Sequence, residues 1–226
     1  HPYFAQQLGI FYQDQTKPKI SHFINAIPKS FLKYEFSFNH AFELEEYDNS
    51  KRLNLILPLQ SPYEDLYKSF NTNTKRNIKK NMKLNWHFNN NVVIHDFLEL
   101  KKNNPVSNLT DQHYAILEQL FEQLIIRKYA QIIGIADEQN KLLSAALFLT
   151  YKNRIIYLFS ASANDGKLNS CMFKIVNKVI QDNAGKNLLL DFEGSMISGV
   201  ARFFKGFRAQ EEYYYRIVKK NLKLIT

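Results

Sequence analysis

The chain has 226 residues, of which 45% are hydrophobic and 23% are charged, values that exclude an intrinsically disordered chain. Seven Gly and six Pro are too few for a collagen-like or low-complexity architecture, and the single cysteine, Cys171, excludes an internal disulfide framework. The formal net charge of +9 favours anionic partners such as phosphates, nucleic acid or an acidic membrane surface, with a lysine-rich solvated surface as the alternative.

The first third of the chain mixes strand and helix signals. Tyr34, Phe36 and Phe38 alternate with polar residues, which predicts a half-buried strand. Apolar residues at helical spacing predict a helix over residues 19–27. The other elements expected here are an extended segment at 3–12, a strand at 53–57 and helices at about 63–70 and 74–84. The three asparagines at 89–91 mark a loop, and we place a boundary there between residues 1–91 and 92–226.

From residue 92 onward the pattern is more regular. Thr110 can cap a long helix that reaches Lys128, and Gly185 ends a helix that begins at Asn169 or Ser170. The remaining elements expected here are strands at 92–94, 131–136, 142–150, 154–161, 188–192 and 211–218, and helices at 96–102 and 198–206. Antiparallel hairpins followed by a crossover helix and a parallel strand predict a mixed α+β fold.

Two stretches of sequence carry a family resemblance. The motif DFEGS at 191–195 ends a strand, and GVARFFKGF at 199–207 follows it; earlier, residues 63–80 end in NTKRNIKK. Together they resemble Fem-type peptidoglycan aminoacyltransferases and related acetyltransferase-like domains of the GNAT superfamily, whose order of elements is also similar. In that family a D-F-x-G-S-like strand end precedes a gv-x-x-F-K-x-x-F-G helix and a tyrosine-bearing strand. Here Arg208 and Ala209 replace the last glycine.

The resemblance implies a GNAT-like acyl-CoA N-acyltransferase fold over roughly residues 3–217. Family members often hold two tandem GNAT-like halves, and residues 1–91 would form an incomplete first half while 92–226 form the C-terminal acyltransferase domain. The implied activity moves an acyl or aminoacyl group from a CoA thioester or aminoacyl-tRNA onto an amine, in cell-envelope biosynthesis. The donor is then a co-substrate, acyl-CoA or aminoacyl-tRNA, rather than a tightly bound cofactor. The acceptor would be a small molecule or a cell-envelope precursor, and tRNA a further partner.

The hydrophobic segments of the sequence bear on the cellular location of the protein. The longest nearly apolar run, residues 142–151, is too short to span a bilayer, and no signal peptide is visible. We therefore expect a cytoplasmic protein without a transmembrane segment, free in the cytoplasm or at the inner membrane surface. Because the chain begins with His1 rather than Met, we expect it to be part of a longer protein.

The loop before the crossover helix is the candidate donor site. Acetyl-CoA enzymes of the superfamily carry Q/R-x-x-G-x-G/A there, whereas this chain has one glycine, Gly166. The N–H groups and dipole of a helix N-terminus attract phosphate, Gly166 allows close backbone approach, and Lys167 adds positive charge. An ordinary capped loop without a ligand is the alternative. The candidate donor-binding residues are Ser162, Asn164, Gly166, Lys167, Asn169 and Ser170.

A cationic face is predicted on the helix at 74–84. At about 100° per residue its cations fall within one sector of about 140°, and Ile78 and Met82 lie outside that sector, where they can face the core. The members of this cationic face are Lys75, Arg76, Lys79, Lys80 and Lys83. Such a face suits a polyanion or a phosphorylated substrate, with a solvated helix surface as the alternative. We take Lys75, Arg76, Lys79 and Lys80 as candidate substrate-binding residues.

Two carboxylates are the first candidate catalytic groups. Asp191 and Glu193 lie two apart at the end of a strand, so a continuing extended conformation would point both to one side. One of them could then act as a general base on an incoming amine. The alternative is structural, with Asp191 capping a turn and Glu193 pairing with Arg202 or Lys205.

The last strand and the short helix before it supply the other candidates. Tyr213 and Tyr215 are candidate general acids for the leaving group, with aromatic strand packing as the alternative. Arg202 and Lys205, three apart on one helix, could hold a substrate phosphate or stabilise an oxyanion, with a surface ion pair as the alternative.

The remaining signals narrow the functional classes. The six histidines show no metal-ligand spacing, so no metal is expected. Cys171 lies in an apolar helix, which favours a buried thiol over a nucleophile. No P-loop, G-x-S-x-G elbow or G-x-G-x-x-G motif is present. The alternative to an acyltransferase is a non-catalytic module that binds an anionic polymer or nucleic acid through the cationic face.

Overall fold

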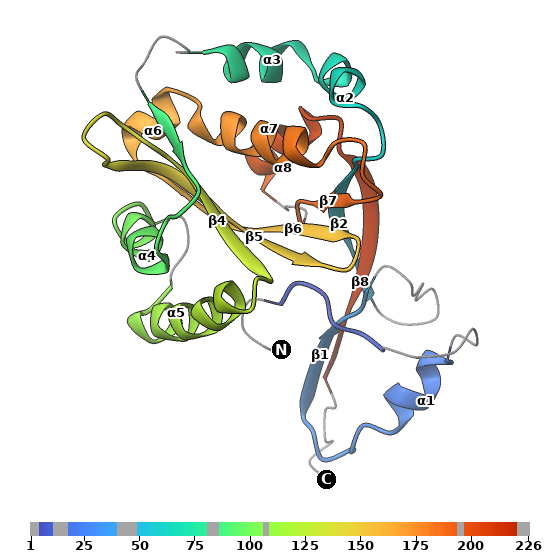
Figure 1. Ribbon diagram of the computed structural model, residues 1–226. Helices are drawn as coiled ribbons and strands as arrows, with labels where there is room; N and C mark the ends of the chain where they lie inside the picture. The colour runs from blue at the N-terminus through green and yellow to red at the C-terminus, as the bar shows by residue number, and fades with distance from the viewer. Residues whose placement is uncertain are drawn as a thin grey trace. The chain divides into compact units, whose positions relative to one another are not determined.

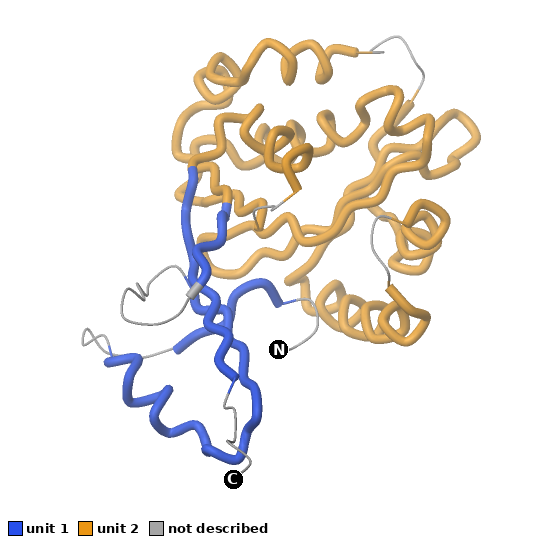
Figure 2. Tube along the Cα trace, turned by 180° about the vertical axis from the view of Figure 1, so that it is seen from behind, with its two compact units in different colours: residues 1–54, 211–226 blue, residues 55–210 orange. Residues whose placement is uncertain are grey.

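The computed structural model describes residues 5–10, 18–39, 49–80, 86–105, 109–193 and 197–220 (Figure 1). The chain forms two compact units (Figure 2). Unit 1 comprises residues 1–54 and 211–226, and unit 2 comprises residues 55–210. The expected division at residue 91 concerns homologous halves of a tandem fold rather than compactness, and it stays a prediction.

Unit 1 contains a short helix, one whole strand, nearly all of a second and the first half of a third. Strand β1 (Lys33–Ser37) pairs antiparallel with β8 (Gln210–Lys220), whose other neighbour is β2 (Asn49–Pro58). Helix α1 (Ile20–Asn25) contributes Ile24 to a small core with Phe38 and Ile217. The helix expected at 19–27 and the strand expected at 34–38 are thereby confirmed.

Unit 2 is built on a mixed sheet. Its strand order is β2-β7-β6-β5-β4-β3, with the further members β7 (Leu189–Asp191), β6 (Arg154–Ser162), β5 (Leu142–Tyr151), β4 (Ala130–Ala136) and β3 (His87–Asn89). Strands β3 to β6 form antiparallel neighbours, β6 and β7 are parallel, and β7 pairs antiparallel with β2. The mixed α+β fold and the parallel strand after a crossover helix are confirmed.

Helices cover both faces of the β4–β6 region (Figure 1). Helices α4 (Ile94–Lys102) and α5 (Asp111–Ile126) lie on one face, and the crossover helix α7 (Cys171–Asn183) lies on the other. The remaining helices are α2 (Tyr63–Ser69), α3 (Thr72–Lys79), which packs against α7, α6 (Asn164–Leu168) and α8 (Ser198–Lys205). Among the described residues, no helix has both the length and the apolar character that crossing a bilayer requires.

Local sequence explains several helix ends. Thr110 caps α5 by accepting from the backbone N–H of His113, whose side chain returns a bond to the Thr110 backbone. Asn71 caps α3 by accepting from the backbone N–H of Thr74 at 2.8 Å. Cys171, at the start of α7, is fully buried, and burial raises the pKa of its thiol, as a core cysteine requires.

Two expectations about elements are wrong. Residues 92–94 form no strand; the strand here is β3, and Ile94 already begins α4 with Val93 as its N-cap. The loop expected at 162–170 contains the short helix α6, which the sequence pattern did not reveal. Of the helix expected at 74–84, residues 81–85 lie outside the described residues.

Candidate active site at the fork between β6 and β7

Strands β6 and β7 form a fork. They pair only from Arg154 to Ile156, opposite Leu189 to Asp191, and β6 then continues to Ser162 without β7. The next residue of the β7 segment, Phe192, donates its backbone N–H to Leu55 at 2.9 Å, so this segment stays attached to β2 as it leaves β6. The register of β6 against β5 shifts between Phe159 and Tyr157, which places a bulge at Leu158, next to the fork.

Aromatic rings fill the base of the fork. Tyr157 and Phe192 are the first residues of the two strands beyond the paired stretch, and their ring centroids lie 6.3 Å apart. Phe204 of α8 contacts both rings, at 5.5 Å from Tyr157 and 4.6 Å from Phe192. All three side chains are buried. Apolar packing therefore holds the strands apart where their hydrogen-bonded pairing ends.

Asp191 ends β7 as a buried, fully engaged carboxylate. Only 4% of the residue is exposed, and Arg154 at the start of β6 pairs with its Oδ2. The other oxygen, Oδ1, accepts the backbone N–H of Glu193 at 2.8 Å. The turn-capping alternative for Asp191 thus describes part of its role, and Arg154 is a partner that the sequence analysis missed.

Glu193 has a different environment from Asp191. Its backbone has φ 56°, so the strand has ended and the expected continuation of the extended conformation is wrong. Burial, with repulsion from Asp191, raises the pKa of the Glu193 carboxyl to about 8. Within the described ranges, no lysine or arginine forms an ion pair with Glu193, so the expected partners Arg202 and Lys205 do not hold it.

A carboxyl with a pKa of about 8 can take or give a proton at physiological pH. Asp191 and Glu193 therefore have different environments: Arg154 pairs with Asp191, whereas burial and the neighbouring Asp191 raise the pKa of Glu193. The geometry suits proton transfer to or from a group bound in the fork.

The two candidate tyrosines belong to unit 1. Tyr213 is 37% exposed, its hydroxyl donates to Glu211, and this bond raises the pKa of the phenol, which weakens it as an acid. Tyr215 is half-buried against the core that contains Ile24 and accepts the backbone N–H of Phe38 at 2.7 Å. Aromatic strand packing describes Tyr215, while the acid role of Tyr213 stays a prediction.

The candidate donor loop is compactly bonded to itself. The backbone N–H groups of Lys167, Asn169 and Ser170 donate to carbonyls within the loop, and Ser162 Oγ accepts from Ser144 at 2.8 Å. Gly166 is buried, and a Cβ there would lie 2.3 Å from the Leu143 carbonyl oxygen. The absence of a side chain at this glycine is therefore needed for α6 to pack on β5. Asn164 and Lys167 are exposed.

The cationic face meets the donor loop. Lys80 Nζ donates to the Leu168 carbonyl at 2.5 Å, and the Ser170 hydroxyl donates to Asn77 Oδ1 at 2.8 Å. Lys75 is partly covered and bonds the Lys68 carbonyl, whereas Arg76 and Lys79 are exposed. Lys83 and Met82 lie outside the described residues.

A cavity of about 330 Å³ lies beside this junction. Its walls come from α3, β3 and α7, and they are Ile78, Phe88, Lys174, Asn177, Lys178 and Gln181. Ile78 therefore faces a cavity that also carries two lysines, rather than a closed core. Arg202 and Lys205 lie elsewhere, on the exposed side of α8.

A buried lysine is the second residue that sequence reasoning missed. Lys101 occupies a core position of α4, where it follows Ile94, Phe97 and Leu98 at helical spacing. A lysine inside an apolar stripe was the signal in the sequence that could have identified it.

Within the described ranges, no three His, Cys, Asp or Glu side chains are placed to hold a metal ion.

Comparison with known proteins identifies the fold. No protein-family model matches the chain, and no curated protein matches it in sequence. Its structure is similar to that of FemX, with a TM-score of 0.59 and 15% identity over 76% of this chain and 63% of FemX. The chain thus spans less than two thirds of FemX.

Two further solved structures support the same fold. A conserved protein of unknown function from Bacteroides thetaiotaomicron has a TM-score of 0.56 and 8% identity, covering 87% of this chain and 65% of that one. A functionally unknown conserved protein from Staphylococcus epidermidis has a TM-score of 0.55 and 12% identity, covering 92% and 83%. The expected resemblance to a Fem-type protein is thereby confirmed at the level of the fold.

Proposed function

We propose that the chain is an N-acyltransferase that moves an acyl or aminoacyl group from a CoA thioester or an aminoacyl-tRNA onto an amine. The observation that carries this proposal is the fork between β6 and β7, which ends beside Glu193 with its pKa of about 8. The FemX-like fold supports it, and a role on a cell-envelope precursor is the corresponding acceptor proposal.

The chemistry assigned to the site follows from its charges. An amine arrives largely as an ammonium ion, and Glu193, as carboxylate, accepts one proton from it. The free amine then attacks the donor carbonyl carbon and forms the new C–N bond. Collapse of the tetrahedral intermediate breaks the C–S or C–O bond, and the second proton on nitrogen passes to the leaving thiolate or alkoxide. Asp191, held by Arg154, raises the basicity of Glu193.

The donor phosphates are assigned to the junction of α3 with α6 and α7. Lys80 and Ser170 lie at this junction, and the exposed cations Arg76 and Lys79 lie on the same helix as Lys80. An extended array of cations suits a long polyanion such as tRNA, whereas a single phosphate group needs only one or two of them. This assignment leans toward aminoacyl-tRNA as the donor.

The test combines donor binding with turnover. The purified chain is heated with CoA, acetyl-CoA, a long-chain acyl-CoA or aminoacyl-tRNA, and a ligand at 100 times its dissociation constant should add about 2.7 kcal/mol to the free energy of unfolding. Transfer to primary amines is then measured across pH for the wild type, Glu193→Gln and the exposed control Glu138→Gln.

We expect kcat to fall about 10²–10⁴-fold in Glu193→Gln, and the rise of kcat with pH around pH 8 to disappear, while Glu138→Gln keeps the wild-type profile. Unchanged turnover in Glu193→Gln would reject Glu193 as the base. The compact bonding of the donor loop favours a second candidate, a non-catalytic module for an anionic polymer. Steeply salt-dependent polyanion binding without turnover of any donor would establish that candidate instead.

A further inference from the structure

Lys101 is a buried cation that the proposed proton transfer does not use. It shares the buried face of α4 with Ile94, Phe97 and Leu98, and only 6% of the residue is exposed. A lysine is rarely buried to this extent unless its ammonium has a charged or hydrogen-bonding partner.

The partners of Lys101 are weak. Its Nζ donates to the Ser160 carbonyl at 3.4 Å and lies 5.1 Å from the centroid of the Phe159 ring. In the part of the chain that the structure describes, no carboxylate pairs with it, and burial lowers the pKa of its amine. Three N–H donors with one long hydrogen bond leave most of the donor capacity unused.

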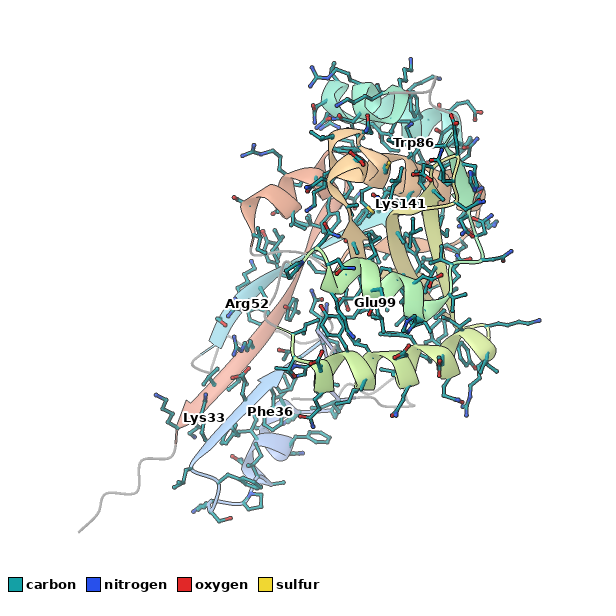
Figure 3. All side chains as sticks on the ribbon, turned by 90° about the vertical axis from the view of Figure 1, so that its left-hand side faces the viewer. Lys33, Phe36, Arg52, Trp86, Glu99 and Lys141 are labelled. Atoms are coloured by element: carbon teal, nitrogen blue, oxygen red, sulfur yellow. The ribbon has the colours of Figure 1, made fainter. Side chains whose placement is uncertain are left out.

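The neighbouring lysine has an ordinary environment. Lys102 is exposed, pairs with Glu99 at 3.6 Å and lies 5.2 Å from the Tyr114 ring centroid. Glu99, on the outer face of α4 (Figure 3), serves Lys102 and not Lys101. Of these two neighbouring lysines, Lys102 has a carboxylate partner, whereas the described residues supply none to Lys101.

The carbonyl that Lys101 contacts belongs to the open edge of β6. Ala163 donates its N–H to Leu143, so residues at even spacing from Ala163 direct their backbone groups toward β5. Ser160, three residues away, directs its carbonyl to the opposite side, which β7 covers only as far as Ile156. The ammonium of Lys101 therefore lies at the edge that the fork leaves unpaired.

We propose that Lys101 binds a carboxylate of the substrate at the unpaired edge of β6, and that this protein acts on a donor or an acceptor bearing such a group. The carboxylate supplies the counter-charge that Lys101 lacks and accepts the N–H groups that the single long bond to the Ser160 carbonyl leaves unused. The inference rests on the proposed acyl transfer for its setting, since either the acyl group or the amine acceptor can carry the carboxylate.

Two matched pairs of probes test the proposal by calorimetric titration. Succinyl-CoA against butyryl-CoA tests a carboxylate on the donor, and glycylglycine against glycylglycinamide tests one on the acceptor. We expect the wild type to bind the carboxylate member of one pair about tenfold or more tightly than its neutral partner. Lys101→Met and Lys101→Gln should reduce this ratio to about twofold or less, while Lys102→Met keeps it.

A structural role for Lys101 predicts a different result. Because an unpaired buried ammonium costs free energy, Lys101→Met should melt at the wild-type temperature or above it. A large fall in melting temperature in both Lys101 variants, a wild type that prefers neither carboxylate, or a preference that survives in Lys101→Met would each overturn the proposal.

The outcomes also separate this inference from the proposed function. A Lys101-dependent carboxylate preference without turnover of any donor would keep the anion site and remove the acyltransferase assignment. Turnover that depends on Glu193, with no carboxylate preference, would support the acyltransferase assignment and reject the anion site at Lys101.

Discussion

Lys80 donates a hydrogen bond to the carbonyl of Leu168 across 88 residues of sequence, at a distance of 2.5 Å. This bond ties the end of the cationic face on α3 to the last residue of α6 in the donor loop. Ser170 and Asn77 add a second link between the same segments. Two surfaces that were separate candidates in the sequence are therefore neighbours in the structure, and the cations of α3 would attract a phosphate bound at the loop.

If this junction binds a polyanion, each exposed cation on α3 should contribute to the salt dependence of the binding constant. Arg76→Gln and Lys79→Gln each remove one exposed cation, so each should reduce the slope of log K against log salt by about one for bulk tRNA. Fluorescence anisotropy at several salt concentrations measures the slope. Lys141→Gln, on the turn before β5, is the control (Figure 3). Equal slopes in all four proteins would show that the cationic face takes no part in binding.

The raised pKa of Glu193 predicts a fall in stability with rising pH. Between pH 4.5 and about 8, the folded protein keeps the Glu193 proton that the unfolded chain releases. The free energy of unfolding therefore decreases as the pH rises through this window, and the contribution is constant above it.

Urea unfolding at pH 5 to 9 checks this expectation. Relative to the wild type, Glu193→Gln should gain about 1–3 kcal/mol over that range, less than the full shift implies because the side chain is partly exposed. A stability difference that does not change with pH would contradict the assigned pKa.

The pair formed by Arg154 and Asp191 predicts a large single-site effect. Arg154→Met leaves a carboxylate that is 4% exposed without its counter-charge, which should cost about 3–5 kcal/mol of unfolding free energy. Arg154→Met combined with Asp191→Asn should recover part of this loss because no uncompensated charge remains. Urea unfolding of the single and double variants gives the coupling, and strictly additive losses would argue against the pair.

The single variant Asp191→Asn should also change the pH dependence of the transfer rate. Removing the negative charge beside Glu193 lowers the pKa of Glu193, so the rise of the transfer rate with pH should move to lower pH. The pH profile of kcat measures this shift. If kcat still rises around pH 8 in this variant, burial alone sets the pKa of Glu193.

Two glycines provide a matched test of packing. Gly166→Ala places a Cβ 2.3 Å from the Leu143 carbonyl oxygen. Because this is a backbone atom of β5 that cannot move without distorting the strand, we expect the free energy of unfolding to fall by about 2–4 kcal/mol. Gly199→Ala in α8 meets open space and should gain about 0.5–1 kcal/mol from helix propensity. Thermal unfolding should move in opposite directions for the two variants; a stable Gly166→Ala would disprove the close packing of α6.

Strongly patterned elements could be predicted from the sequence. The capping residue Thr110 and the apolar stripe of α7 located both helices to within two residues at their beginnings. The strand predicted at 92–94 was wrong because three β-branched residues are too few to distinguish strand from helix periodicity. Val93 is instead the N-cap of α4, and Ile94 is its first residue. Helix α6 has five residues, and its position depends on Gly166 packing against β5, which no local pattern encodes.

The site could be predicted only in part. Asp191 and Glu193 were identified by residue type and strand position, but their different environments depend on the pairing of Arg154 with Asp191 and on the turn at Glu193. Arg154 reaches Asp191 because the parallel register places Ile156, two residues further, beside it. That register connects residues 37 positions apart, and it exists only once β6 and β7 are paired.

The rings of Tyr157, Phe192 and Phe204 have a consequence for binding kinetics. Because these side chains pack where β6 and β7 part, the separation of the two strands is part of the folded core and is completed when the chain folds. A molecule that enters the fork would not have to break strand pairing. Association should then be limited by diffusion and orientation instead of by a conformational step, with little entropy lost by the backbone on docking. In the proposed function, the binding site is therefore preorganised, and packing of the hydrophobic core sets its shape.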